Sequence, residues 1–225
     1  MQMKLVYLFK KKGRMRFVSH LDMQRFLMRA LNRTCLPIAF SQGFNPHPVM
    51  SLASALAMGY ESDYEVFEIK INGNNIPKET ALKTMRDALP EEMEIIDVRY
   101  VNDNHPSMMS LVTLAVYEIT PPTEHMEQLK AAAREFLLSE SVPGIRKTKS
   151  GEREVDLRPL CLQLNCSETD FRAYLMLTEQ DTLKPALLMS TLYSMAKLEP
   201  GDCRYKRICL MGKDSVGNFR TIMEL

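Results

Sequence analysis

Residues 3–31 read MKLVYLFKKKGRMRFVSHLDMQRFLMRAL and join a strand pattern to a helix pattern. From 3 to 10, the side chains alternate between two faces in the way that is typical of a strand. Ser19 is a typical helix N-cap, and Asp22 is placed to complete a capping box. Beyond Ser19, apolar residues recur every three or four positions, which predicts an amphipathic helix that ends before Pro37. A strand followed by such a helix favours a mixed α+β fold.

The rest of the first half continues this alternation. The pattern predicts strands at 38–40, 66–71 and 95–101 and a helix at 77–90. Together with residues 3–31, these elements have the order βαββαβ, which is that of a ferredoxin-like unit.

The second half repeats the order around a basic hairpin at 145–159, after a polar link at 102–110. The predicted elements are strands at 111–119, 160–165, 171–178 and 205–211, with helices from Thr123 and from Pro185. The fold class predicted is therefore α+β, with two tandem ferredoxin-like domains at residues 1–103 and 110–225.

Charge is segregated along the 225-residue chain, although the formal net charge is only +1. Residues 1–50 carry a net +8, residues 51–110 carry −6, and residues 111–225 carry −1. A basic segment in a nearly neutral protein suggests a polyanionic partner such as RNA. The alternative is a solvated face with internal ion pairs to the acidic segment.

The sequence contains no motif that is typical of a cofactor-binding, metal-binding or membrane-spanning protein. The five cysteines and four histidines show no zinc or iron–sulfur spacing, and neither a P-loop nor GxGxxG occurs. We therefore expect no cofactor and no metal. No apolar run approaches the roughly 20 residues of a membrane helix. The odd cysteine count and the absence of a signal peptide favour a cytoplasmic protein.

Three arginines form a row on the predicted helix of the first half. Arg25, Arg29 and Arg33 are spaced by four and repel one another mildly, so folding alone does not favour them. We expect this row to contact phosphates.

The loop Ser41-Gln42-Gly43-Phe44-Asn45-Pro46-His47-Pro48 is the segment richest in specialised residues. Gly43 permits a left-handed bend, and the two prolines stiffen the chain. Gln42 and Asn45 carry amides that can read a base edge, and Phe44 offers a face for stacking. The alternative is an ordinary turn in which His47 caps a strand.

Histidines are the candidate catalytic groups. His47 in the loop and His20 at the helix start could act as general acid or base, although the sequence does not place them within reach of each other. The alternative for His20 is a helix-start residue with local hydrogen bonds.

The hairpin candidate of the second half supplies a second basic element. Its basic residues, Arg153 among them, flank a Ser-Gly turn and suit contacts with phosphates. Asp156 and Arg158 are two apart, so on a strand they would share one face and pair with each other or with a ligand. A solvated hairpin with internal ion pairs is the alternative.

Four strings together resemble the radical SAM-linked protein family, a domain of unknown function found fused to, or encoded beside, radical S-adenosylmethionine enzymes. They are Arg16-Phe17-Val18-Ser19-His20-Leu21-Asp22, the 41–48 loop, Gly59-Tyr60-Glu61-Ser62 and Val155-Asp156-Leu157-Arg158-Pro159. The resemblance implies a freestanding bacterial accessory protein with a radical SAM enzyme as partner. It adds Arg16, Ser19, His20 and Asp22 to the candidate binding residues. Val49 departs from the pattern, because relatives often carry a basic residue there.

Three functions follow from these observations. The first is a binding module that presents RNA or a ribosomal substrate to the radical SAM enzyme. The second is a protein-only adaptor for that enzyme. The third is a metal-free RNA endonuclease with a histidine base, suggested by fold analogy alone.

Overall fold

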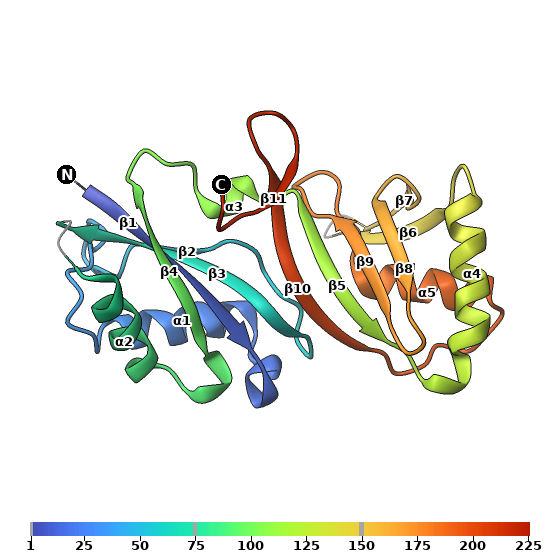
Figure 1. Cartoon of the computed structure of the whole chain (residues 1–225), viewed down its shortest axis with the longest axis horizontal. Helices are drawn as coiled ribbons and strands as arrows, with labels where there is room; N and C mark the ends of the chain where they lie inside the picture. The colour runs from blue at the N-terminus through green and yellow to red at the C-terminus, as the bar shows by residue number, and fades with distance from the viewer. Residues whose placement is uncertain (1, 74–75, 149–150) are drawn as a thin grey trace. The chain divides into compact units, whose positions relative to one another are not determined.

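The computed structural model describes residues 2–73, 76–148 and 151–225. The chain divides into two compact units (Figure 1). Unit 1 comprises Met1–Val112 and Cys209–Leu225, and unit 2 comprises Thr113–Ile208. Both contain helices and mostly antiparallel strands, which confirms the predicted mixed α+β class.

Unit 1 is built around β1, which lies between β3 and β4, while β2 pairs with β3; all three pairs are antiparallel. The elements of this unit are β1 (Gln2–Lys11), the 3-10 helix η1 (Gly13–Phe17), α1 (His20–Leu31), β2 (Met50–Leu52), β3 (Glu61–Asn72), α2 (Lys78–Ala88), η2 (Glu91–Met93), β4 (Ile95–Asn102), α3 (Met108–Leu111) and β11 (Phe219–Thr221). Strand β10 (Arg204–Lys213) begins in unit 2 and ends in unit 1, where it pairs with β11.

The core of unit 1 follows from the alternation of β1 and β3. Leu5, Tyr7 and Phe9 of β1 lie on one face with their cross-strand partners of β3, and α1 and α2 cover this face. The side chains of Tyr7 and Phe67 stack with ring centroids 5.0 Å apart. Burial of each such side chain contributes about 1.5–3 kcal/mol, so this layer holds the helices on the sheet.

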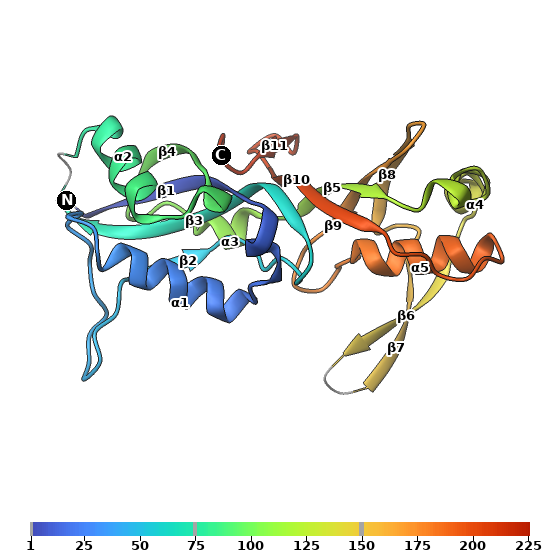
Figure 2. The same cartoon turned by 90° about the horizontal axis from the view of Figure 1, so that it is seen from below.

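Unit 2 places β9 between β5 and β8 in antiparallel pairs, with β10 on the other side of β5. Strands β6 and β7 form a separate hairpin that stands apart from these strands (Figure 2). The elements of this unit are β5 (Leu114–Thr120), η3 (Thr123–His125), α4 (Met126–Leu138), β6 (Pro143–Thr148), β7 (Gly151–Asp156), β8 (Cys161–Cys166), β9 (Phe171–Met176) and α5 (Pro185–Met195).

Several local expectations differ from the structure. The segment between the first strand and the first helix, for which no element was predicted, forms the 3-10 helix η1, which begins at Gly13 with a φ of +55°. Residues 38–40 make only isolated bridges, Ile38 with Ile71 and Phe40 with Pro48. The second domain was expected to span residues 110–225, whereas Cys209–Leu225 is part of unit 1. No helix in the described part of the chain combines the length and apolar composition needed to span a bilayer.

Candidate functional site

The segregated charges of the sequence meet in unit 1. Strand β1 lies between β3 and β4, so cations of residues 1–50 face acids of residues 51–110. The ion pairs between these segments are Lys4–Glu68 (3.9 Å), Lys10–Glu94 (3.3 Å), Lys12–Asp63 (3.6 Å), Arg14–Glu92 (3.7 Å) and Arg16–Glu61 (3.5 Å). Internal pairing, the second of the two interpretations of the charge pattern, therefore accounts for much of the segregation.

Only two of the three arginines that were expected to form a row lie on helix α1. Arg25 and Arg29 are exposed on α1, and Arg25 Nη1 lies 3.3 Å from Asp22 Oδ1. Helix α1 ends at Leu31, so Arg33 lies in the turn beyond it, and its Nη2 donates to the Ala88 carbonyl oxygen (3.0 Å) at the end of α2. Arg33 therefore helps to join two helices, and the exposed cations of α1 are Arg25 and Arg29.

The start of α1 follows the predicted capping pattern. Ser19 Oγ accepts the Asp22 N–H (3.2 Å), and the Ser19 hydroxyl donates to Asp22 Oδ2 (2.7 Å). This hydrogen bond, together with Arg25, holds the pKa of Asp22 below its usual range. Asp22 and Ser19 thus stabilise the end of the helix that begins at His20.

The loop at 41–48 is a hairpin with a braced neck. The Ser41 N–H donates to the His47 carbonyl oxygen (2.9 Å), and the His47 N–H donates to Ser41 Oγ (3.1 Å). His47 Nδ1 lies 2.9 Å from the same hydroxyl and 3.3 Å from the Asn45 carbonyl oxygen. Outside the neck, the Val49 N–H donates to the Ala39 carbonyl oxygen (2.9 Å). Ser41 and His47 therefore fix the neck and leave the tip to project.

The tip carries the most exposed aromatic ring among the described residues. Phe44 is fully exposed, and Gln42 and Asn45 beside it are exposed as well. Gly43 has a φ of +123°, which a residue with a side chain rarely adopts. In Figure 2 this loop extends away from the strands of unit 1, past the end of α1. The tip is thus free to contact a ligand.

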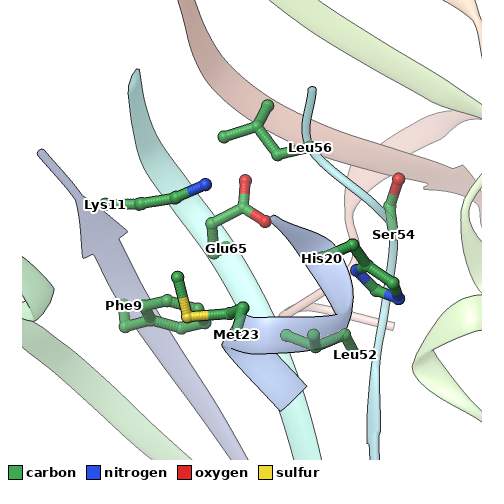
Figure 3. Close-up of a pocket in the computed structure, with 8 residues that line it drawn as sticks. All are labelled: Phe9, Lys11, His20, Met23, Leu52, Ser54, Leu56 and Glu65. Carbon is green, nitrogen blue, oxygen red and sulfur yellow. The ribbon is translucent and has the colours of Figure 1, made fainter. Parts of the chain in front are cut away.

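A small pocket lies at the other end of α1. It is lined by His20 and Met23 of α1, by Phe9 and Lys11 of β1, by Glu65 of β3, and by Leu52, Ser54 and Leu56 (Figure 3). Lys11 and Glu65 were not anticipated as site residues. The signal for them was their register: Lys11 continues the buried row of Phe9, and Glu65 continues the buried row of Phe67.

The two histidines proposed as catalytic groups do not meet. The pocket beside His20 reaches Glu65 of β3, whereas the base of the 41–48 hairpin is bonded to Lys70 of the same strand. Glu65 and Lys70 are five positions apart along the strand, a distance of about 17 Å. His20 and His47 therefore do not form an acid–base pair.

Two of the strings quoted from the sequence, 16–22 and 59–62, are in contact with each other. The Gly59 N–H donates to the Arg16 carbonyl oxygen (2.8 Å), and Arg16 Nη1 lies 3.5 Å from Glu61 Oε1. The Arg16 guanidinium also lies over the ring of Phe17, 4.8 Å from its centroid. These contacts assign Arg16 to holding residues 59–62 against η1.

In unit 2, Asp156 and Arg158 are committed to backbone groups. Asp156 Oδ1 accepts the Val142 N–H (2.9 Å) and the Arg158 N–H (3.0 Å), and these bonds lower the pKa of Asp156. The Arg158 side chain donates to the carbonyl oxygens of Leu137 (3.2 Å) and Cys161 (2.9 Å). Strand β7 ends at Asp156, so the two side chains do not share a strand face as expected.

Arg153 remains an exposed residue of the hairpin, directly opposite Arg146. Like charges in direct opposition disfavour pairing of the two strands. Arg146 is anchored by a hydrogen bond from Nη1 to the Gln180 carbonyl oxygen (3.0 Å). The expected Ser-Gly turn includes Lys149 and Ser150, which lie outside the described residues. A contact of Arg153 with phosphate stays a prediction.

Within the described residues, neither a metal-binding cluster nor, at Cys161 and Cys209, a reactive thiol is indicated. No group of three His, Cys, Asp or Glu side chains in that part of the chain is arranged to hold a metal ion. Burial raises the pKa of Cys161 to about 12 and that of Cys209 to about 11, so neither forms a thiolate near neutral pH.

Comparison with known proteins gives one result at the level of the family. No curated protein matches the chain. A family model described as an uncharacterized protein conserved in bacteria (DUF2344) matches residues 4–185, which is most of the chain and includes the 41–48 hairpin and the pocket. This description names no radical SAM enzyme. On the length of this match, the chain belongs to the DUF2344 family of uncharacterized proteins conserved in bacteria.

Proposed function

We propose that unit 1 is an RNA-binding module that contacts unpaired bases with the tip of the 41–48 hairpin and phosphates with Arg25 and Arg29. The observation that carries this proposal is the fully exposed ring of Phe44 on a hairpin whose neck is fixed by Ser41 and His47. The Phe44 ring contributes nothing to the core, and the hydrogen-bonded neck holds it out into solvent, which supports a role in binding.

The chemistry of the tip suits bases better than it suits an apolar partner. Bases stack on aromatic faces with little dependence on sequence, and each stacked base contributes about 1–3 kcal/mol. The exposed amides of Gln42 and Asn45 can donate to and accept from base edges at the same time. A single ring flanked by amides therefore supports recognition of one or a few unpaired bases.

Few cations are available for phosphates. Arg25 and Arg29 are exposed on α1, and the pair of Arg25 with Asp22 lies at the surface, where such pairs contribute little. We therefore expect weak to moderate affinity for RNA, with a large share from stacking.

Phe44 variants test the proposal by fluorescence anisotropy with a short single-stranded RNA of mixed sequence. Phe44→Ala is expected to weaken binding by about 5- to 100-fold, which corresponds to the loss of one stacked base. Phe44→Tyr keeps an aromatic face and is expected to bind like the wild type, whereas Phe44→Leu is apolar without such a face and is expected to bind like Phe44→Ala.

Val216→Ala is the matched control, because Val216 is an exposed apolar residue in the loop between β10 and β11. Equal affinity of the wild type and Phe44→Ala would contradict the proposal. Shortening of the RNA in the presence of a chelator, by the wild type and not by His47→Ala, would instead favour the endonuclease.

We further propose that each unit is a ferredoxin-like domain. In unit 1 the order β4-β1-β3-β2 with antiparallel neighbours supports this assignment. In unit 2 the order β10-β5-β9-β8 supports it, with the β6–β7 hairpin inserted between α4 and β8.

We also propose a radical SAM enzyme as the partner, in the bacterial cytoplasm; this rests on the four sequence strings that resemble the radical SAM-linked proteins. Affinity purification of the full chain from its host, with and without ribonuclease, tests this proposal. Recovery of a radical SAM enzyme would support it, and recovery that ribonuclease does not change, from a chain that binds no RNA, would favour the protein-only adaptor. Absence of such an enzyme from both preparations would overturn the partnership.

A further inference from the structure

A second pocket of unit 1 lies at the base of the 41–48 hairpin, beside the end of β3. Its volume is about 400 Å³, which is within the range of roughly 300–1,000 Å³ for pockets that hold small molecules. The hairpin and its flanks line it with Phe40, Ser41, Gln42 and Val49, and β3 lines it with Lys70 and Asn72. The Ala39 N–H donates to the Lys70 carbonyl oxygen (2.8 Å), and the Lys70 N–H donates to the Val49 carbonyl oxygen (3.0 Å). Both legs of the hairpin are therefore joined to the strand that forms the floor of the pocket.

Two amides of this lining keep their full hydrogen-bonding capacity. Gln42 and Asn72 are exposed, and in the part of the chain that the structure describes neither side-chain amide makes a hydrogen bond. Lys70 differs, because its ammonium donates to Asp103 Oδ2 (2.9 Å), which leaves its methylene groups as pocket wall. The Ser41 hydroxyl is engaged in the neck of the hairpin. The uncommitted polar groups of the pocket are thus two neutral amides.

The chemistry of the lining favours a base over a phosphate. Among the described residues that line the pocket, the only cation is Lys70, and it is already paired with Asp103. Phe40 and Val49 are 47% and 38% exposed, so they offer apolar surface to a flat ring. A side-chain amide presents a donor beside an acceptor, and adenine presents the complementary amino group beside a ring nitrogen. Asn and Gln therefore pair with adenine through two hydrogen bonds.

Gln42 connects this pocket to the tip of the hairpin. It lines the pocket and stands two positions before Phe44, so the Cα atoms of the two residues are at most about 7 Å apart. In Figure 2 the hairpin leaves unit 1 beside the end of β3, where Asn72 is the last residue of the strand. A single strand with one base on the Phe44 ring therefore has a neighbouring base within reach of the pocket.

We propose that this pocket receives a second unpaired base, an adenine, beside the base that stacks on Phe44, and that the amides of Gln42 and Asn72 bind its edge. Stacking on one aromatic ring tolerates any base, so Phe44 by itself gives affinity without sequence preference. Hydrogen bonds to a base edge add that preference. The inference rests on the proposed function, because it names the base that the same surface selects.

Short oligouridine RNAs that differ only in their central base test this inference on the full chain by fluorescence anisotropy. The central base is uracil, adenine, guanine, cytosine, or adenine with two methyl groups on its exocyclic nitrogen. The wild type is expected to bind the adenine RNA at least about fivefold more tightly than the uracil RNA, as one two-bond amide contact provides. The dimethylated RNA is expected to bind like the uracil RNA, because the methyl groups remove the donor and leave the ring in place.

Asn72→Leu removes one of the two amides at similar volume and is expected to abolish most of the preference for adenine. Asn72 is exposed and its side chain bonds to no described residue, so the variant is expected to fold, which its melting curve by circular dichroism checks. The matched control is Asn102→Leu, because Asn102 is an exposed asparagine at the end of β4, outside the lining of the pocket. This control is expected to keep the preference for adenine.

The possible outcomes separate the two proposals. A wild type that binds none of the RNAs overturns the proposed function, and the adenine pocket with it. Binding that depends on Phe44 but is equal for all central bases, or is tightest for guanine or cytosine, overturns the pocket assignment alone. A preference for adenine that survives in a folded Asn72→Leu variant also overturns it. Loss of the preference in Asn72→Leu, with the preference retained in Asn102→Leu, supports it.

Discussion

Asp156 shows how a single carboxylate acts through backbone groups. Its Oδ1 accepts the N–H groups of Val142 and Arg158, and these bonds, Val142 first, lower its pKa in the folded chain. A carboxylate whose pKa is lower in the folded state stabilises that state above its unfolded pKa of about 3.9. The stabilisation is lost as the pH falls through the lower pKa of the folded state.

Asp156→Asn is therefore expected to lower the melting temperature near neutral pH. It is also expected to make the melting temperature fall less steeply as the pH is lowered (the acid limb of the stability curve). Thermal melts between pH 2 and 7, followed by circular dichroism, measure this effect. Glu154→Gln, at an exposed position of the same strand, is expected to leave the acid limb unchanged. Parallel acid limbs for the wild type and Asp156→Asn would show that the two hydrogen bonds add no stability.

The role of a single residue can be predicted from the sequence when its partners are close to it in the chain. Ser19 and Asp22 are recognisable as a cap because a cap needs only residue types at fixed spacing. The role of Asp156 depends on where β7 ends, and its partner Val142 lies fourteen positions away. Lys11 and Glu65 become visible only when each is placed in the buried phase of its strand, and this requires the ends of both strands to be known.

Helix α1 is the element whose start the sequence defines best, and its cap gives a direct prediction. Ser19→Ala removes the acceptor for the Asp22 N–H, so it is expected to lower the free energy of unfolding by about 1 kcal/mol. Urea denaturation measures the loss. Because the Ser19 hydroxyl is the main cause of the low pKa of Asp22, this pKa is also expected to rise in the variant, which NMR titration can follow.

Ser19→Thr retains the hydroxyl and is the control for this variant, with stability close to that of the wild type. An unchanged pKa of Asp22 in Ser19→Ala would contradict the assignment of the cap.

Elements with many periodic residues are predicted well, and short elements are not. The strand predicted at 95–101 and the helix predicted from Pro185 correspond to β4 (Ile95–Asn102) and α5 (Pro185–Met195). Strand β11 has only three residues, and it pairs with β10, so nothing in its own sequence identifies it. The neck of the 41–48 hairpin is likewise formed by hydrogen bonds between Ser41 and His47, and the pattern of apolar and polar residues does not predict these bonds.

For the whole molecule, the distribution of ion pairs predicts how RNA binding responds to salt. For single strands, the logarithm of the binding constant falls with the logarithm of salt concentration with a slope of about −0.7 per phosphate contact. Two arginines on α1 give a slope of about −1.4, whereas nine free cations would give about −6. We expect a shallow slope, because most cations of residues 1–50 are bonded within unit 1.

Titrations of RNA binding at increasing potassium chloride concentration measure this slope, and Arg25→Ala with Arg29→Ala is expected to bring it close to zero. Arg33→Ala is the comparison, because Arg33 donates to the Ala88 carbonyl oxygen and should affect stability more than the slope. A slope near −6, or one unaffected by the double variant, would assign the phosphate contacts to other residues.

The charge pattern shows why a global property is hard to interpret from sequence. A net +8 in residues 1–50 is compatible with a polyanionic partner and with internal ion pairs. The choice depends on the register that places β1 between β3 and β4, where Lys10 approaches Glu94 and Lys12 approaches Asp63. Long-range pairing of strands sets this register, and it cannot be obtained from the composition of either segment.

The discontinuity of unit 1 has a consequence for the order of folding during synthesis. Cys209–Leu225 belongs to the same compact unit as Met1–Val112, and all of unit 2 lies between them in the chain. A ribosome therefore releases every residue of unit 2 before it supplies the strand segments that complete unit 1. The first half of the nascent chain therefore emerges before residues 209–225 are available to pack against it, and a fragment ending at Val112 lacks the segment that completes its unit.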